Sequence, residues 1–144
     1  MVPFAGYEMP VQYQSVIAES KAVREHAGMF DVSHMARLTL VGDRVIEYLE
    51  WVTANDISKL SDRVGQYSLL PNEAGGLVDD IIVYRITATT FSMVVNASNH
   101  AKDVAFLVAD AGDEILGLDP GAVQAEQPFQ EQHQGDDPDR KSVV

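Results

Sequence analysis

The sequence predicts an α+β fold, an antiparallel sheet with helices packed on one face. From residue 30 onward the segments follow the order strand, helix, three strands, helix. The last three strand-like segments are separated by short turns, which is typical of an antiparallel meander. With 46% hydrophobic and 22% charged residues over 144 positions, the chain has the composition of one globular domain or of a piece of a larger protein.

The first 41 residues indicate an extended segment, a helix and a strand. Residues 1–13 mix prolines and glycine with aromatic residues, which favours an extended segment laid against a core. Ser15 can cap a helix expected over residues 15–27, and Gly28 stands where a left-handed residue often ends a helix. Residues 29–41 are predicted to form a strand that is covered on both faces for part of its length.

A second helix is expected after Asp43, which can cap it. Its buried stripe is predicted to contain Val45, Ile46, Leu49 and Val52. Trp51 has helical spacing from these residues and is expected in the core. Residues 53–64 are polar and form a connection anchored by Ile57 or Leu60.

The meander and a last helix complete the predicted fold. Its strands are expected at residues 66–70, 77–86 and 91–95. Gly75 and Gly76 supply the turn before the second of these strands, and Ser98 or Asn99 begins the last helix. We therefore expect residues 1–112 to form the folded part. Residues 113–144 change in composition, and residues 124–140 lack any 2- or 3.6-residue period, so this tail is predicted to be disordered.

Charge and composition exclude several kinds of function. The net charge of −12 disfavours a sequence-independent grip on nucleic acid or on anionic membrane lipid. With no cysteine, disulfides, thiolate metal sites and thiol catalysis are excluded, and the His residues lack metal-ligand spacing, so no metal site is expected. No apolar stretch is long enough to span a membrane. The expected compartment is the cytoplasm.

Asp79 and Asp80 are the most specific chemical feature, because they stand at the entry of a strongly apolar strand. Side chains alternate between the two faces of a strand, so these carboxylates must point in opposite directions. A carboxylate that faces a cavity at such a place would be partly desolvated. Its pKa would then be raised, which would make it a better proton acceptor.

Several motifs in a fixed order resemble the aminomethyltransferase (T-protein) family of the glycine cleavage system. They are the runs at residues 3–10, 27–35, 54–56, 75–80 and 94–99. The resemblance covers roughly residues 1–110. It implies a tetrahydrofolate-dependent enzyme that takes the aminomethyl group from the lipoyl arm of the H-protein, releases ammonia and forms 5,10-methylenetetrahydrofolate.

The resemblance also implies site residues. The first carboxylate of the pair, Asp79, would hydrogen-bond the folate near N10 and help the pterin nitrogen attack, while Asp80 would be structural. Met35 and Tyr67 would supply apolar and aromatic surface to the folate pocket, and the Asn96 amide would meet pterin edge atoms. Each of these three also has a simpler structural interpretation, in the core or in a turn.

Alternatives remain within and outside this family. The same superfamily includes demethylases and the folate-binding parts of sarcosine and dimethylglycine oxidases, and a non-catalytic binding module is a third possibility. The tRNA-modifying branch of this superfamily is disfavoured because its signature needs a cysteine and this chain has none. Members of the family are longer, so we expect this chain to be an N-terminal fragment that lacks other walls of the pocket.

Overall fold

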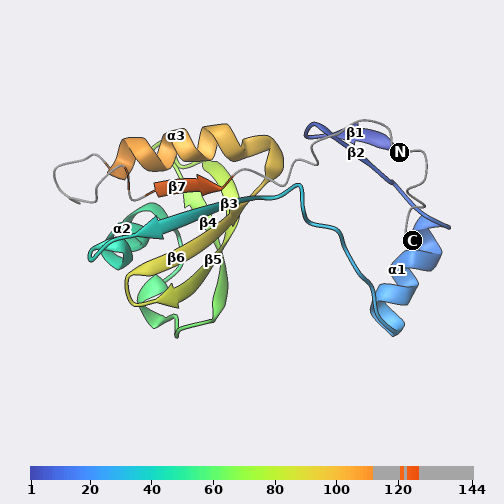
Figure 1. The fold of residues 1–144 in the computed structure, drawn as a ribbon, viewed down its shortest axis with the longest axis horizontal. Helices are drawn as coiled ribbons and strands as arrows, with labels where there is room; N and C mark the ends of the chain where they lie inside the picture. The colour runs from blue at the N-terminus through green and yellow to red at the C-terminus, as the bar shows by residue number, and fades with distance from the viewer. Residues whose placement is uncertain (112–120, 122, 127–144) are drawn as a thin grey trace, which may run out of the picture.

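The computed structural model describes residues 1–111, 121 and 123–126, and Figure 1 shows how they are arranged. The helices are α1 Val16–Glu25, α2 Val45–Val52 and α3 His100–Ala111, with short 3-10 helices η1 Ile57–Lys59 and η2 Ala97–Asn99. The strands are β1 Val2–Phe4, β2 Tyr7–Met9, β3 Ala36–Val41, β4 Gly65–Pro71, β5 Leu77–Thr87, β6 Thr90–Val95 and β7 Val123–Glu126. The predicted α+β class is confirmed.

A five-stranded sheet in the order β4-β5-β6-β3-β7 forms the centre of the fold. Every neighbouring pair is antiparallel, so the predicted meander of β4, β5 and β6 is confirmed. Strand β3 inserts between β6 and β7, and its register places Ala36 opposite Val95. The sheet therefore brings the residue before β3 next to the residue after β6, although they are distant in sequence.

Strict alternation along the central strands divides the sheet into a buried face and an open face. Leu38, Val83 and Met93 are fully buried, while their neighbours along each strand are exposed or half-buried. The buried face packs against α2 and α3, where Leu49 and Leu107 are also fully buried. Helices thus cover one face of the sheet, as predicted.

Helix α2 is amphipathic, and its buried stripe consists of Val45, Tyr48, Leu49 and Val52. The Tyr48 hydroxyl donates a 2.7 Å hydrogen bond to the Leu107 carbonyl on α3, which joins the two helices inside the core. The prediction that Trp51 is in the core is wrong, since its side chain is 67% exposed. Trp51 stands one helical turn after Glu47 and falls outside the buried stripe.

The N-terminal part lies apart from the sheet in Figure 1 and contains a β1-β2 hairpin and α1. Ser15 caps α1 as predicted, by accepting a hydrogen bond from the Ala18 amide. Within residues 16–25, however, no side chain is fully buried. The predicted strand over residues 29–41 begins only at Ala36, because β6 and β7 pair with residues 36–41 and offer nothing to the preceding segment.

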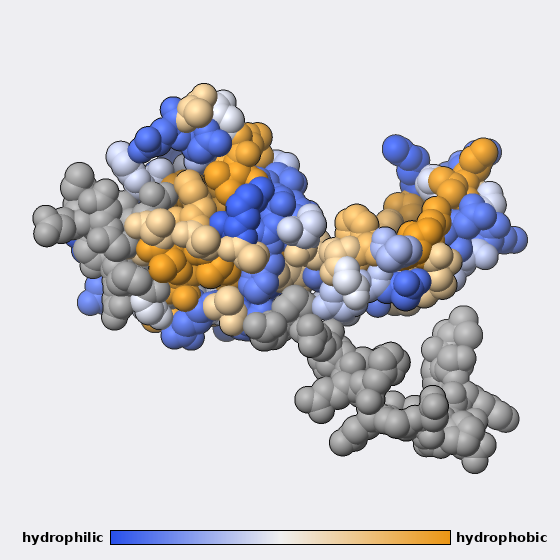
Figure 2. All heavy atoms as spheres, turned by 90° about the horizontal axis from the view of Figure 1, so that it is seen from above, coloured by the Kyte–Doolittle hydropathy of each residue, from blue (hydrophilic) through white to orange (hydrophobic). Residues whose placement is uncertain are grey.

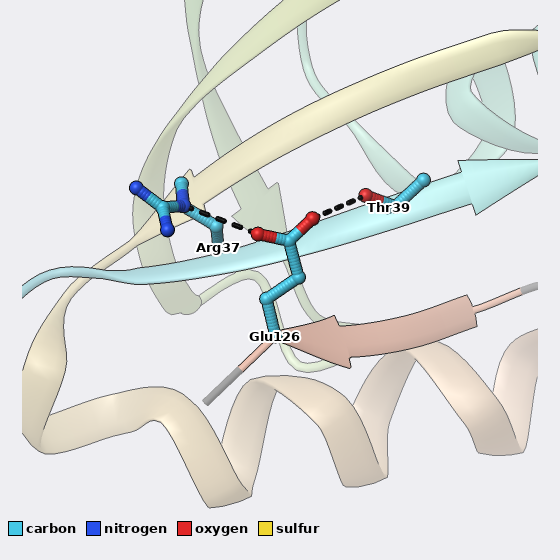
Figure 3. A network of polar contacts seen from close by, with 3 residues as sticks. All are labelled: Arg37, Thr39 and Glu126. Atoms are coloured by element: carbon cyan, nitrogen blue, oxygen red, sulfur yellow. Dashed lines mark hydrogen bonds and ion pairs between the residues drawn. The ribbon is translucent and has the colours of Figure 1, made fainter. Parts of the chain in front are cut away.

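One part of the predicted disordered tail is a strand. Residues 123–126 form β7 on the edge of the sheet, and Figure 3 shows Glu126 accepting hydrogen bonds from Arg37 Nε at 3.3 Å and Thr39 Oγ1 at 3.1 Å. The sequence showed no strand period here because β7 is short. A four-residue edge strand with one buried side chain has almost no alternation of buried and exposed residues. The rest of the predicted tail, residues 113–120, 122 and 127–144, lies outside the described residues.

Tyr48→Phe is expected to destabilise the chain by about 1–3 kcal/mol, because it leaves the buried Leu107 carbonyl without this donor. The matched control is Tyr84→Phe on the half-exposed open face, expected within about 0.5 kcal/mol of the parent. Urea unfolding followed by circular dichroism measures both. Equal effects of the two substitutions would show that the buried hydrogen bond contributes nothing.

Candidate functional site

The open face of the sheet carries a group of solvent-accessible aromatic and aliphatic side chains. Tyr67 is 57% exposed, Ile82 36% and Tyr84 39%. The register places Tyr67 opposite Ile82 and Ile82 opposite Val94, so these side chains form a row across three strands. Soluble domains seldom expose such a contiguous apolar surface without a use for it, which makes this face a candidate binding surface.

Asp80 lies on the same open face, two residues before Ile82 on β5. Two side chains donate hydrogen bonds to its carboxylate. The Tyr67 hydroxyl donates to Asp80 Oδ2 at 3.2 Å, and Asn96 Nδ2 donates to Asp80 Oδ1 at 2.9 Å. Desolvation, followed by the hydrogen bond to Asp80, raises the pKa of Tyr67, so its phenol remains a donor at neutral pH. The result is an exposed carboxylate in a fixed position at the end of an apolar face.

Asp79 points to the opposite side, into the core, and is only 6% exposed. Its oxygens accept hydrogen bonds from the Asn96 amide at 3.0 Å, Asn96 Nδ2 at 2.9 Å and Asn99 Nδ2 at 2.6 Å. Burial raises the pKa of Asp79, but the hydrogen bonds from Asn96 and Asn99 together outweigh it and leave the pKa below its usual value.

These positions correct two expectations about the carboxylate pair. Asp79 was expected to face a ligand cavity with a raised pKa, yet it faces the core with a lowered one. Asp80 was expected to be structural, yet it is the exposed member and lies beside Tyr67 and Asn96. The alternation of the strand was predicted correctly, but which face is covered depends on the helices.

Asn96 links the two carboxylates, because its side chain reaches both faces of β5 at the edge where β6 ends. Besides its bonds to the two carboxylates, Nδ2 approaches the Asp80 carbonyl at 3.3 Å. Met35 is half-buried directly before β3, and the pairing of Ala36 with Val95 brings it to the same edge as Asn96. The structure therefore brings Tyr67 and Asn96 into contact with Asp80 and leaves Met35 at the same end of the sheet.

Ile82 and Tyr84 also belong to this face, and the sequence analysis missed them as site residues. Their spacing from Asp80, two and four residues along one strand, was the available signal. Tyr84 lies over Gly65 on β4, where an added Cβ would stand 2.5 Å from Tyr84 Cε1. Gly65 thus leaves room for the aromatic ring to lie flat on the open face.

A hollow of about 490 Å³ lies in the N-terminal part between β2, α1 and the segment that follows the helix. The His34 ring beside it meets Phe4 and Tyr7 edge-on, with centroids 5.8 Å and 6.3 Å apart. Figure 2 shows hydrophobic residues at the surface of this part too, and Phe30 is 69% exposed. His34 therefore packs among aromatic rings, in agreement with a structural role.

Across the residues that the structure describes, no three His, Cys, Asp or Glu side chains converge as metal ligands would. Nor does this part of the chain contain a helix both long and apolar enough to cross a membrane.

Comparison with known proteins identifies relatives of most of the chain. Residues 1–129 match the family model of the GCVT N-terminal domain. An aminomethyltransferase of Chlorobaculum parvum is 52% identical over 112 residues, which cover 78% of this chain and 31% of that protein. An aminomethyltransferase of Thermus thermophilus is 52% identical over 109 residues, or 76% of this chain and 31% of the relative.

A solved structure has the same fold. The crystal structure of the glycine cleavage system aminomethyltransferase T from Bartonella henselae superposes with a TM-score of 0.71 at 37% identity, over 77% of this chain and 31% of that one. The chain thus spans about a third of the length of the relatives it matches. The family match also extends past residue 112, where the sequence analysis placed the end of the folded part.

Asp79→Asn is expected to destabilise the chain by roughly 1–3 kcal/mol, because a buried acceptor of three N–H groups is replaced by an amide. Asp80→Asn, on the exposed side, is expected to stay within about 0.5 kcal/mol. Since the folded-state pKa of Asp79 is lowered, its contribution is present above about pH 4 and is lost as the pH falls below that.

Urea unfolding at pH 7 and acid unfolding monitored by circular dichroism measure both effects. The Asp79→Asn chain should lose less additional stability on acidification than the parent does. If Asp80→Asn were the more destabilising change, the assignment of Asp79 to the core contact would be contradicted.

Proposed function

Because the chain belongs to the aminomethyltransferase family of the glycine cleavage system, we propose that the open sheet face is one wall of a tetrahydrofolate site. In the proposed reaction, the aminomethyl carbon passes from the lipoyl arm of the H-protein to tetrahydrofolate. The carbon–sulfur bond breaks and leaves a lipoyl thiol, two folate nitrogens each lose a proton as they bond to the carbon, and ammonia departs. The proposed compartment is the cytoplasm.

The observation that carries this proposal is an exposed apolar face that ends in a fixed carboxylate. A pterin is a flat heteroaromatic ring with N–H groups along its edges, and it needs apolar surface against the ring and an acceptor at the edge. Tyr67 and Ile82 offer the surface, and Asp80 offers the acceptor. Met35 and Asn96, at the same edge, would extend the contact around the pterin.

We assign the folate-facing carboxylate to Asp80 in place of Asp79. A group that hydrogen-bonds the attacking nitrogen must reach the ligand, and Asp79 is 6% exposed with its oxygens already occupied by three N–H donors. Asp80 accepts two side-chain hydrogen bonds and is still open to solvent. A carboxylate has about four acceptor positions, so Asp80 has capacity to accept a proton or an N–H from folate.

The comparisons favour this activity over the alternatives that the sequence left open. The relatives at about half identity bear the name aminomethyltransferase, and none of those described above is a demethylase or an oxidase. Transfer of the aminomethyl group, with the H-protein as donor, is therefore our proposal for a complete protein that contains this domain. A non-catalytic module would share the fold and would bind folate without turnover.

Asp80→Asn is expected to lower turnover about 10²- to 10⁴-fold in a complete aminomethyltransferase that contains this domain, because the amide cannot accept a proton. Asp79→Asn should lower turnover much less once rates are corrected for the folded fraction. The assay follows folate-dependent ammonia release from aminomethylated H-protein. A large loss from Asp79→Asn in a fully folded protein, with none from Asp80→Asn, would return the role to Asp79.

The 144-residue chain alone is expected to bind tetrahydrofolate weakly and to turn over little or none. Tyr67, Ile82 and Tyr84 are 36–57% exposed, whereas effective sites enclose about 70–90% of a ligand's surface. Calorimetry with tetrahydrofolate measures the binding, and the ammonia-release assay measures the turnover. Both are carried out with and without a separately expressed C-terminal portion of a complete family member. Full activity of the short chain alone would show that one wall is sufficient.

A further inference from the structure

Two carboxyl groups meet inside the core, and the proposed reaction does not use this contact. Asp103, in the first turn of α3, is fully buried, and neither of its carboxyl oxygens has a hydrogen-bond donor among the described residues. After burial, the strongest influence on its pKa is the carboxyl group of Asp79 on β5, which acts through a hydrogen bond and through its charge. The contact joins the entry of β5 to the beginning of α3.

Two neighbouring carboxylates inside a protein repel each other, so the pair keeps one proton to a higher pH than an isolated carboxyl group would. The surroundings decide which group holds it. Asp79 receives N–H bonds from Asn96 and Asn99, all of which stabilise an anion. Asp103 receives none of these bonds and is more deeply buried, so the proton belongs to Asp103.

The charged and titratable groups around Asp103 support this assignment. Asp79 faces it from β5. On α3, Lys102 favours an ionised Asp103, but its ammonium group bonds the Val78 carbonyl at 2.6 Å, while His100 lies one turn before Asp103. Burial first, and then the hydrogen bond to Asp79 and its charge, raise the pKa of Asp103 to about 7.

We propose that Asp103 is a positioning residue that is protonated in the folded chain and donates its proton to Asp79, thereby fixing Asn96 and, through it, Asp80. The contacts run from the core to the open face: Asp103 to Asp79, Asp79 to Asn96 Nδ2, and Asn96 Nδ2 to Asp80. The significance of Asp80 rests on the proposed function, whereas the shared proton rests only on the buried pair.

Loss of this proton would place a second negative charge beside Asp79. The Asn96 amide would then be attracted more strongly to the core, at the expense of its bond to Asp80. Asp103 thus connects the ionisation of the core to the position of the carboxylate on the open face. The connection uses side chains alone and requires no movement of the sheet.

The first experiment needs no variant. The 144-residue chain, labelled with ¹³C at the aspartate carboxyl carbons and ¹⁵N at the asparagine amides, is titrated by NMR from pH 4 to pH 9. We expect one aspartate carboxyl to titrate near pH 7 and the Asn96 side-chain amide to shift with the same midpoint. The proposal is overturned if every aspartate carboxyl titrates below pH 5, or if the Asn96 amide does not follow.

Asp103→Asn assigns the titrating group, since its amide still donates to Asp79 but cannot ionise. The titration near pH 7 and the matching Asn96 shift should disappear, while the exposed control Asp43→Asn keeps both. A titration that persists in Asp103→Asn would overturn the proposal. Tetrahydrofolate is absent from these measurements, so failure of folate binding and failure of the shared proton are separate results.

Thermal unfolding gives a second measure of the same proton. Because the pKa of Asp103 is raised in the folded state, its contribution is complete below about pH 4 and is lost as the pH rises to about 7. The thermal midpoint of the Asp103→Asn chain minus that of the parent chain should therefore increase from pH 5 to pH 8, because only the parent chain loses this contribution. A difference that stays constant over this range would indicate an Asp103 that is merely structural and would contradict the shared proton.

Discussion

The fold and its candidate site both depend on the position of Asn96 between two carboxylates. This residue directly follows β6, and its amide groups hold Asp79 on the buried side of β5 and Asp80 on the open side. Adjacent residues of a strand are obliged to point in opposite directions, so a single amide next to the strand can contact both only where the sheet ends. That constraint places the exposed carboxylate at one edge of the apolar face.

The buried side of this arrangement secures the helix that covers the core. Asp79 accepts from Asn96 and Asn99, which lead into α3, and it meets Asp103 one turn later. Polar groups in a core are costly unless they are satisfied, and the Asp79 oxygens are satisfied by the N–H groups of Asn96 and Asn99. The same contacts therefore stabilise the packing of α3 and determine which carboxylate is available to a ligand.

The open side has the character of an unfinished binding site. Tyr67, Ile82 and Tyr84 present apolar surface that a folded monomer would ordinarily cover, and the N-terminal helix α1 likewise buries none of residues 16–25 fully. The relatives are about three times as long as the matched region, which covers 31% of each. Both surfaces are open to contact with other segments or molecules.

The sequence by itself determined the class of fold, the meander and the approximate helix positions, because these depend on local periodicity and on turn residues. Of the predicted helix caps, Ser15 is used, whereas Asp43 is not, since the N-cap of α2 is Arg44 and makes no side-chain cap hydrogen bond. The sequence also predicted that Asp79 and Asp80 would separate, since alternation is a property of the strand alone. Which of the two faces the core depended on where α2 and α3 pack, and no local pattern contains that information. For the same reason the burial of Asp79, the exposure of Trp51 and the pairing of residues 123–126 with β3 were decided by the tertiary structure alone.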